Sequence, residues 1–273
     1  MELNPSLEAD IRVPVAQIRQ APRADQTAEV EADEAAFWVN RKAREFTAQQ
    51  KADSVAAAEE LRARLAPRFA PRVDSDTAEI VTYARRWEKT DYVVAVNDRR
   101  TFGDYVGQWG RTMEKGLPVS GVVSLADHGR SVRAVYELSR GGACAFTRDG
   151  GRVRVRLDYE TNDGRMLVFL RERIASLRVA CSDSVAPGGV VKAGMQVLGE
   201  SGRPVSALLP VEIRMYDSSG RELDGAGYLA AENGDARVAI RTNVNDAPGP
   251  YRVVFRDRAS GLTATREVAN GGK

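Results

Sequence analysis

The chain has 273 residues, of which 43% are hydrophobic and 29% are charged, as in an ordinary folded protein. Its 40 basic and 38 acidic residues leave a formal net charge of +2, which excludes the strong basic field of a typical nucleic-acid-binding protein. No run approaches the roughly 18 consecutive apolar residues that cross a bilayer, so we expect neither nucleic acid as a partner nor a membrane span.

The first 74 residues divide into two segments by composition. Residues 1–30 contain prolines among charged and small apolar residues, which predicts an extended arm that needs a partner surface to become ordered. Residues 31–74 are rich in Ala, Glu, Lys, Arg and Gln, which predicts a helical segment with a break near Asp53-Ser54, where Asp53 caps a second helix. These helices are expected to pack onto the following domain, and the alternative is a coiled-coil arm for oligomerisation.

Short segments of alternating apolar and polar residues follow over residues 75–181. The stretch from Asp76 to Trp87 fits a helix or a strand, and its β-branched and aromatic content favours a hairpin that turns at Glu88-Lys89-Thr90-Asp91. In Val153–Tyr159 every second residue is apolar, which leaves Arg152, Arg154 and Arg156 on a solvated face, with contact to an acidic polymer as the alternative. Further strands are expected at Val119–Leu125, Val132–Leu138, Arg165–Arg171 and Leu177–Cys181.

The same alternation returns in residues 182–273, beyond an expected domain boundary at Ser182–Pro187. It is clearest in Val211–Tyr216, Ala236–Arg241 and Tyr251–Phe255, which are separated by turns rich in Gly, Pro, Asn and Asp. Such a series is typical of an antiparallel sandwich. We therefore predict a mainly β fold, in which two consecutive antiparallel β-sandwich domains, residues 75–181 and 182–273, follow a helical N-terminal segment.

One long connection, residues 98–118, interrupts the rhythm of the strands and concentrates aromatic residues among glycines and polar residues. Because the C–H faces of sugars pack on aromatic rings while their hydroxyl groups need polar partners, this segment is a candidate glycan-binding site. The alternative is that the rings pack the loop onto its own domain or a neighbouring one. The candidate binding residues are Phe102, Tyr105, Trp109, Arg100, Asp104 and Gln108.

The residue types that usually carry catalysis are few or isolated. The one histidine, His128, lies in an expected turn, and no G-x-S-x-G motif accompanies it. Cys144 and Cys181 are too few for a thiolate metal site, and we expect them to be unpaired, with one disulfide as the alternative. Asp98 and Asp104 share the loop, but nothing in the sequence sets the spacing of a glycosidase carboxylate pair. We therefore predict no catalytic residues, no metal site and no cofactor.

Residues 75–181 resemble the small all-β domain that follows the catalytic barrel in bacterial glycoside hydrolases of the β-galactosidase type. The resemblance lies in Tyr92–Asn97, Ala134–Leu138 and Gly164–Leu170, which follow that family's order of strands. In those enzymes the catalytic carboxylates belong to the barrel, and this chain has no room for a barrel of ~250 residues beside its sandwiches. The resemblance therefore implies an accessory region without catalytic residues of its own.

Residues 183–268 are similar to the immunoglobulin-like MG2 domain of bacterial α2-macroglobulin-like proteins. The similarity lies in Val185–Gly189, Gly202–Val205 and Pro248–Val253. Together the two resemblances imply a non-catalytic accessory region of a larger carbohydrate-active or cell-surface protein, which binds a glycan or packs against a partner domain.

Two alternatives to this function stay open. One is a structural or adhesive surface module without affinity for sugars, and the other is a glycosidase with an unrecognised carboxylate pair. The N-terminus lacks the basic start and apolar core of a signal peptide, which taken literally indicates the cytoplasm. A fragment of a longer exported protein would instead be extracellular or periplasmic, so the sequence leaves localisation and oligomeric state open.

Overall fold

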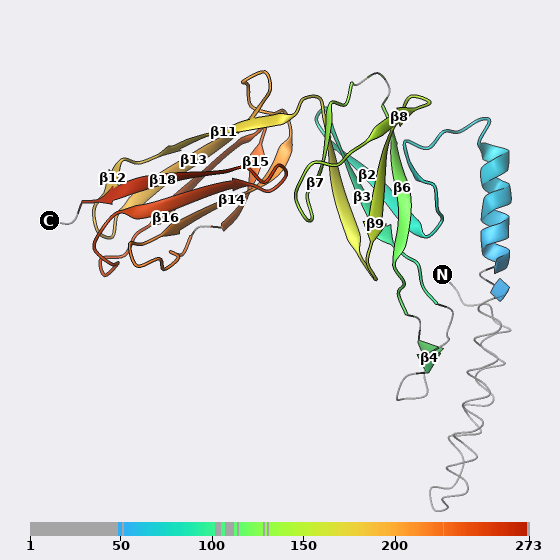
Figure 1. The fold of residues 1–273 in the computed structure, drawn as a ribbon, viewed down its shortest axis with the longest axis horizontal. Coiled ribbons are helices and arrows are strands. Elements are labelled where there is room, and N and C mark those ends of the chain that lie inside the picture. The colour runs from blue at the N-terminus through green and yellow to red at the C-terminus, as the bar shows by residue number, and fades with distance from the viewer. Residues whose placement is uncertain are drawn as a thin grey trace, which may run out of the picture. The chain divides into compact units, whose positions relative to one another are not determined.

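The computed structural model describes residues 49–50, 52–101, 115–127, 129, 131–225 and 227–271, and the backbone alone of residues 105–106 and 112–113. The chain falls into two compact units, one of residues 1–70 and 98–118 and the other of residues 71–97 and 119–273. Figure 1 shows a helix in the first unit and β-strands in the second, where all described pairs are antiparallel except β12 with β18. The predicted fold class, mainly β with sandwich domains after a helical segment, is confirmed.

The helix of the first unit covers residues 52–65, and residues 49 and 50 are also helical. The helix break and cap expected near Asp53 are wrong. Asp53 lies inside the helix, where its carboxylate accepts a hydrogen bond of 2.9 Å from the side chain of Gln49 one turn earlier. The surrounding alanines favour helix strongly enough to carry the chain through this position. Leu61, Leu65 and Phe69 are exposed.

The second unit begins with a sandwich of two four-stranded antiparallel sheets, in the orders β1-β6-β9-β8 and β2-β3-β10-β7. Inward side chains such as Val93, Val123 and Leu167 form its core and are fully buried. The strands are β1 (Val73–Ser75), β2 (Ile80–Trp87), β3 (Thr90–Asn97), β6 (Val119–Ala126), β7 (Ala134–Glu137), β8 (Thr147–Asp149), β9 (Arg152–Tyr159) and β10 (Gly164–Leu170).

The hairpin predicted at the start of this sandwich is confirmed, because β2 and β3 pair along their whole length. The turn is tighter than expected and contains only Glu88 and Lys89. Thr90 and Asp91 lie in β3 instead, where the buried carboxylate of Asp91 forms ion pairs with Arg72 and Arg86. These ion pairs hold Asp91 in the strand rather than in the turn.

The alternation predicted for β9 is also confirmed. Its apolar residues are buried, and the intervening arginines lie on the opposite face. Arg152 donates to the carbonyl oxygen of Pro71 at 2.8 Å, and Arg154 forms an ion pair with Asp149 at 3.1 Å. Two of the three arginines in this stripe therefore have partners within the chain, and Arg156 is exposed.

The C-terminal part of the second unit is one eight-stranded sheet in the order β11-β13-β16-β15-β14-β17-β18-β12. β15 and β16 share only the pair Glu232 and Asp235, so the sheet folds over at the Asn233-Gly234 turn into two layers (Figure 1). The strands are β11 (Ile174–Cys181), β12 (Ser184–Val185), β13 (Val190–Gly199), β14 (Leu208–Tyr216), β15 (Gly227–Glu232), β16 (Asp235–Arg241), β17 (Tyr251–Asp257) and β18 (Thr263–Asn270).

Strand β11 belongs to this C-terminal sheet, because it pairs with β13 from Ile174 to Cys181. The sequence prediction grouped Leu177–Cys181 with the strands before it. Alternation of apolar residues identifies a strand but does not identify its partner, and in the structure the change from one sandwich to the next falls at residues 171–173.

The two sandwiches share one apolar core at their junction. Tyr92, Tyr136 and Val168 lie on the outer face of the β2-β3-β10-β7 sheet, yet they are buried and cluster with the core of the C-terminal sandwich. The Tyr92 hydroxyl donates to the carbonyl of Leu208 at 2.8 Å and accepts from its N–H at 2.7 Å. The sheet is therefore buried on both faces at this end, which explains the continuous burial of β7.

Candidate binding surfaces

The connection predicted as a binding loop contains a two-stranded ladder within the first unit. β4 (Tyr105–Val106) pairs antiparallel with β5 (Thr112–Met113). Closer to the ends of the segment, the N–H of Thr101 donates to the Lys115 carbonyl at 2.8 Å, and Arg100 bridges to Gly116. The described positions of this segment thus include paired backbone, which sequence analysis did not predict because only two residues of each strand are paired at β4 and β5.

The structure describes only part of the predicted site. Arg100 is exposed and forms an ion pair with Asp98 at 2.9 Å. Tyr105 is placed in β4 by its backbone alone. The other four predicted residues, Phe102, Asp104, Gln108 and Trp109, lie outside the described residues, and so does His128. The structure therefore gives no distance between Asp98 and Asp104. The predicted site therefore remains a proposal.

The described part of the chain presents a different aromatic site on the C-terminal sandwich. Tyr228 of β15 lies directly opposite Glu212 of β14 and is 66% exposed. The guanidinium carbons of Arg214 and Arg258 lie 5.9 Å and 5.7 Å from the centre of its ring. The alternation of Leu229 and Ala231 toward the core turns Tyr228 outward, so an outward aromatic in β15 was the available sequence signal.

Four charged side chains around this ring form a connected network. Arg214 donates through Nη1 to both carboxylate oxygens of Glu222 at 2.7 Å, and its Nε contacts Glu212. Glu212 also lies 3.6 Å from Nη1 of Arg258. Hydrogen bonds to Glu222 and Glu212 raise the pKa of Arg214 and so favour its charged form. The network fixes several donors and acceptors beside an accessible ring.

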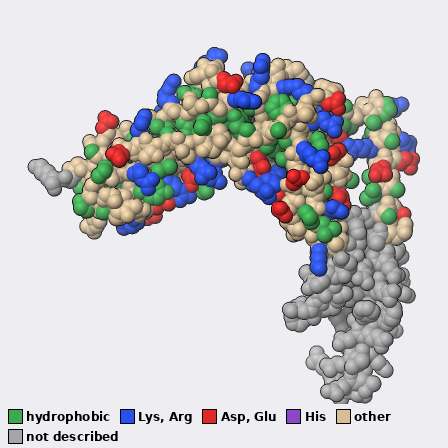
Figure 2. All heavy atoms as spheres, in the orientation of Figure 1, with side chains coloured by type: hydrophobic (Ala, Val, Ile, Leu, Met, Phe, Trp, Pro, Cys, Tyr) green, Lys and Arg blue, Asp and Glu red, His purple; other side chains and the backbone are tan. Residues whose placement is uncertain are grey.

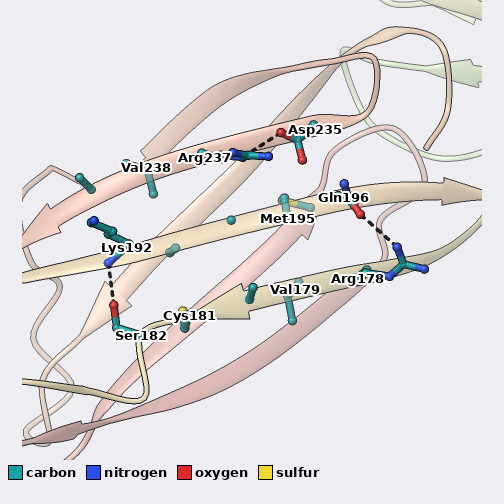
Figure 3. Close-up of a pocket in the computed structure, with 14 residues that line it drawn as sticks. Arg178, Val179, Cys181, Ser182, Lys192, Met195, Gln196, Asp235, Arg237 and Val238 are labelled. Atoms are coloured by element: carbon teal, nitrogen blue, oxygen red, sulfur yellow. Dashed lines mark hydrogen bonds and ion pairs between the residues drawn. The ribbon is translucent and has the colours of Figure 1, made fainter. Parts of the chain in front are cut away.

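A concave feature lies on the layer formed by β11, β13 and β16 (Figure 3), with a volume of ≈ 760 Å³. Gly194 is one of its lining residues and lies between Ala180 and Arg237 in the register of the sheet. A Cβ at Gly194 would lie 3.5 Å from the carbonyl oxygen of Ala236, an ordinary contact. Packing therefore does not require glycine here, and the missing side chain opens the hollow.

The rim of this hollow is polar and carries more positive than negative charge. Arg178 donates to Gln196 at 3.3 Å, and Arg237 forms an ion pair with Asp235 at 3.1 Å (Figure 3). Lys192 lies on the same rim and adds a third cation. An anionic group would complement the rim, but the small side chains of the floor provide no specific recognition.

Neither cysteine is placed for nucleophilic chemistry. Cys144 and Cys181 are both unpaired, as expected from the sequence. Burial raises the pKa of both thiols, which reduces the thiolate that a nucleophile or metal ligand needs. Within the described ranges no group of three or more His, Cys, Asp or Glu side chains is arranged to hold a metal ion.

The described face of the molecule in Figure 2 carries both signs of charge. Figure 2 shows Lys and Arg side chains interspersed with Asp and Glu on the face that it draws, in accordance with the small net charge. No helix in the part of the chain that the structure describes is long and apolar enough to cross a membrane.

No family model matches the sequence, and no curated protein matches it. A rhamnosidase from Novosphingobium sp. PP1Y aligns with 67% of this chain at 14% identity and a TM-score of 0.29. A putative β-galactosidase from Bacteroides fragilis aligns with 58% at 10% identity and a TM-score of 0.26. The adhesin domain of Epf from Streptococcus pyogenes aligns with 70% at 10% identity and a TM-score of 0.26.

The alignments cover 22% of the rhamnosidase, 33% of the β-galactosidase and 81% of the adhesin domain. Two of the three proteins are glycoside hydrolases, the class that residues 75–181 resemble in sequence. At these scores the likeness is a general one among β-rich proteins, and it carries no conclusion about the activity of this chain.

Proposed function

We propose that this chain is a non-catalytic accessory region of a larger carbohydrate-active or cell-surface protein, and that it binds carbohydrate or packs against a neighbouring domain. The observation that carries the proposal is the shared core at the junction of the two sandwiches. Tyr92 joins the sheets through both polar groups of Leu208, and Thr90 Oγ1 donates to the carbonyl of Ser206 at 2.6 Å. Such a junction lets the two sandwiches act together in presenting a binding surface.

Carbohydrate is the favoured ligand class because an exposed ring and a preorganised polar network occur together. Tyr228 offers an apolar face, and the ion pairs of Arg214 supply hydrogen-bonding groups already held in place. Sugars need both kinds of contact. The connection of residues 98–118, which contains Phe102, Tyr105 and Trp109, is proposed as a further site of contact with carbohydrate.

The test is binding and turnover by the purified 273-residue chain. Affinity gel electrophoresis against soluble polysaccharides should show retardation, while incubation with the same polysaccharides and with aryl glycosides should release no reducing sugar or aglycone. Trp109→Ala should weaken binding by about 1–3 kcal/mol and leave the thermal midpoint unchanged if the ring faces a glycan. Turnover abolished by a single carboxylate substitution would establish the glycosidase alternative instead.

A second candidate function, a structural or adhesive module without sugar affinity, has its own supporting observation. The part of the β2-β3-β10-β7 sheet that lies beyond the junction exposes Val81, Tyr83, Val96 and Met166, at 54%, 51%, 42% and 38%. Contiguous apolar side chains on a sheet face are typical of protein contacts. Self-association or protein binding without retardation by any polysaccharide would favour this candidate.

A further inference from the structure

The outer face of β14 and its neighbours carries two tyrosines in line. Glu212, Arg214 and Tyr216 alternate along β14 and so share one face of the sheet, and Tyr228 lies opposite Glu212. Tyr216 lies opposite Arg252 of β17, whose guanidinium carbon is 4.7 Å from its ring centre. Tyr216 lies four positions after Glu212, so the two ring positions lie roughly 13 Å apart along the strand.

The ring of Tyr228 is positioned but not covered. Both guanidinium carbons are close to the ~6 Å limit of a cation–π contact, so they restrain the ring without enclosing it. A ring packed on both faces would not be 66% exposed. One face is therefore open to a ligand, at the end of the line that Tyr216 continues.

The space between the two tyrosines is lined by charged groups that are already paired. Glu222 bridges to Tyr216 in the backbone register and accepts two hydrogen bonds from Arg214. Among the described residues Nη2 of Arg214 donates to no partner, so its N–H groups are available to a ligand hydroxyl. Groups held by ion pairs lose little conformational entropy when a ligand binds.

The charges around Tyr228 also indicate the ligand class. The two arginines, Arg214 and Arg258, are balanced by the two glutamates, Glu212 and Glu222. A polyanion would have to displace or approach these carboxylates, which costs electrostatic energy at short range. A neutral chain of sugar rings meets no such penalty, and it can use carboxylates as acceptors and guanidinium groups as donors.

We propose that this face binds a neutral oligosaccharide chain that lies along β14 from Tyr228 to Tyr216. One sugar ring packs on Tyr228, another on Tyr216, and the hydroxyl groups between them contact Arg214 and Glu222. The inference rests on the proposed carbohydrate-binding function and gives that function a location and a ligand class.

The experiment is affinity gel electrophoresis of the full chain in hydroxyethyl cellulose, xyloglucan, galactomannan and, as the anionic probe, polygalacturonate. At least one neutral polysaccharide should retard the wild-type protein, and Tyr228→Ala should raise its Kd about tenfold or more. Tyr228→Phe should stay within about threefold of wild type, because ring packing does not need the hydroxyl. Tyr83→Ala is the matched control, since Tyr83 is also an exposed tyrosine with an arginine, Arg85, 4.8 Å from its ring.

Each outcome decides a different question, provided that thermal unfolding shows every variant to be folded. Retardation that Tyr228→Ala leaves unchanged would overturn this site while leaving the proposed carbohydrate function intact. Trp109→Ala would then test the connection of residues 98–118. Retardation by polygalacturonate alone would overturn the neutral ligand class. Absence of retardation by every polysaccharide would overturn both the site and the carbohydrate part of the proposed function.

Discussion

The hydroxyl group of Tyr92 satisfies both backbone polar groups of Leu208, since it accepts from the N–H at 2.7 Å and donates to the carbonyl at 2.8 Å. Leu208 is the first residue of β14, and Tyr92 comes from β3 of the preceding sandwich. At Leu208, β14 pairs with Glu232 of β15 but not with β17, and the side chain of Tyr92 takes the place of this second partner strand. This contact ties the start of β14 to the first sandwich.

Removal of that hydroxyl should destabilise the second unit. Tyr92→Phe leaves the half-buried N–H of Leu208 without its side-chain partner, and we expect a loss of about 1–3 kcal/mol in the free energy of unfolding. Urea denaturation measures this loss. The matched change Tyr83→Phe, at a tyrosine that is 51% exposed, should cost less than about 0.5 kcal/mol. Equal effects of the two substitutions would contradict a specific role for the junction.

The same tyrosine predicts an alkaline pH dependence. Burial raises the pKa of Tyr92 from its ordinary value of 10 to about 12. Because the folded-state pKa is raised, the neutral hydroxyl contributes stability that is fully present below pH 10 and is lost as the pH rises from about 10 to 12. The difference in unfolding free energy between wild type and Tyr92→Phe should therefore shrink over this range. A difference that stays constant from pH 9 to 12 would show that Tyr92 titrates normally.

An acidic transition is expected at the opposite end of β14. Hydrogen bonds from the hydroxyl of Ser219 and from the backbone N–H groups of Arg221 and Ser219 lower the pKa of Asp217. Because its folded-state pKa is depressed, Asp217 contributes stability that is present above the unfolded value of about 4 and is lost as the pH falls through the folded value. Asp217→Asn should lower the thermal midpoint at pH 7 and have a smaller effect at pH 3. The same shift at both pH values would exclude ionisation as the cause.

Sequence periodicity predicted the strands well where one face of the strand is buried and the other is exposed to solvent. In β9 the valines at 153 and 155 are fully buried between outward arginines, and in β14 the alternating residues Val211, Ile213 and Met215 are fully buried. This information is local, because burial of one face fixes which residues of a strand must be apolar.

The features that sequence did not predict depend on contacts between distant segments. Nothing in the alternation around Tyr92 shows that its outward face is covered by another sandwich, and nothing in Leu177–Cys181 shows that β13 is its partner. The candidate site at Tyr228 could not be predicted from sequence for the same reason. Tyr228 becomes a binding candidate only when the register places Glu212 opposite it and Arg214 beside it.

A buried ion pair inside the first sandwich gives the last prediction. Arg165 is 6% exposed and donates through Nη1 to both carboxylate oxygens of Glu137 at 2.8 Å and 3.0 Å, and through Nη2 to the carbonyl of Asp158 at 2.7 Å. Arg165→Met leaves the buried carboxylate of Glu137 without its cation, and the free energy of unfolding should fall by about 3–5 kcal/mol.

Adding Glu137→Leu to Arg165→Met should recover much of the lost stability, since it removes the unpaired carboxylate of Glu137, while Asp163, which pairs with Arg165 at 3.0 Å, keeps its ion pair with Arg140 at 2.8 Å. A double-mutant cycle by urea denaturation measures the coupling. If the two single losses simply add in the double variant, the arginine and the glutamate act independently, and the ion pair does not hold this end of the sandwich together.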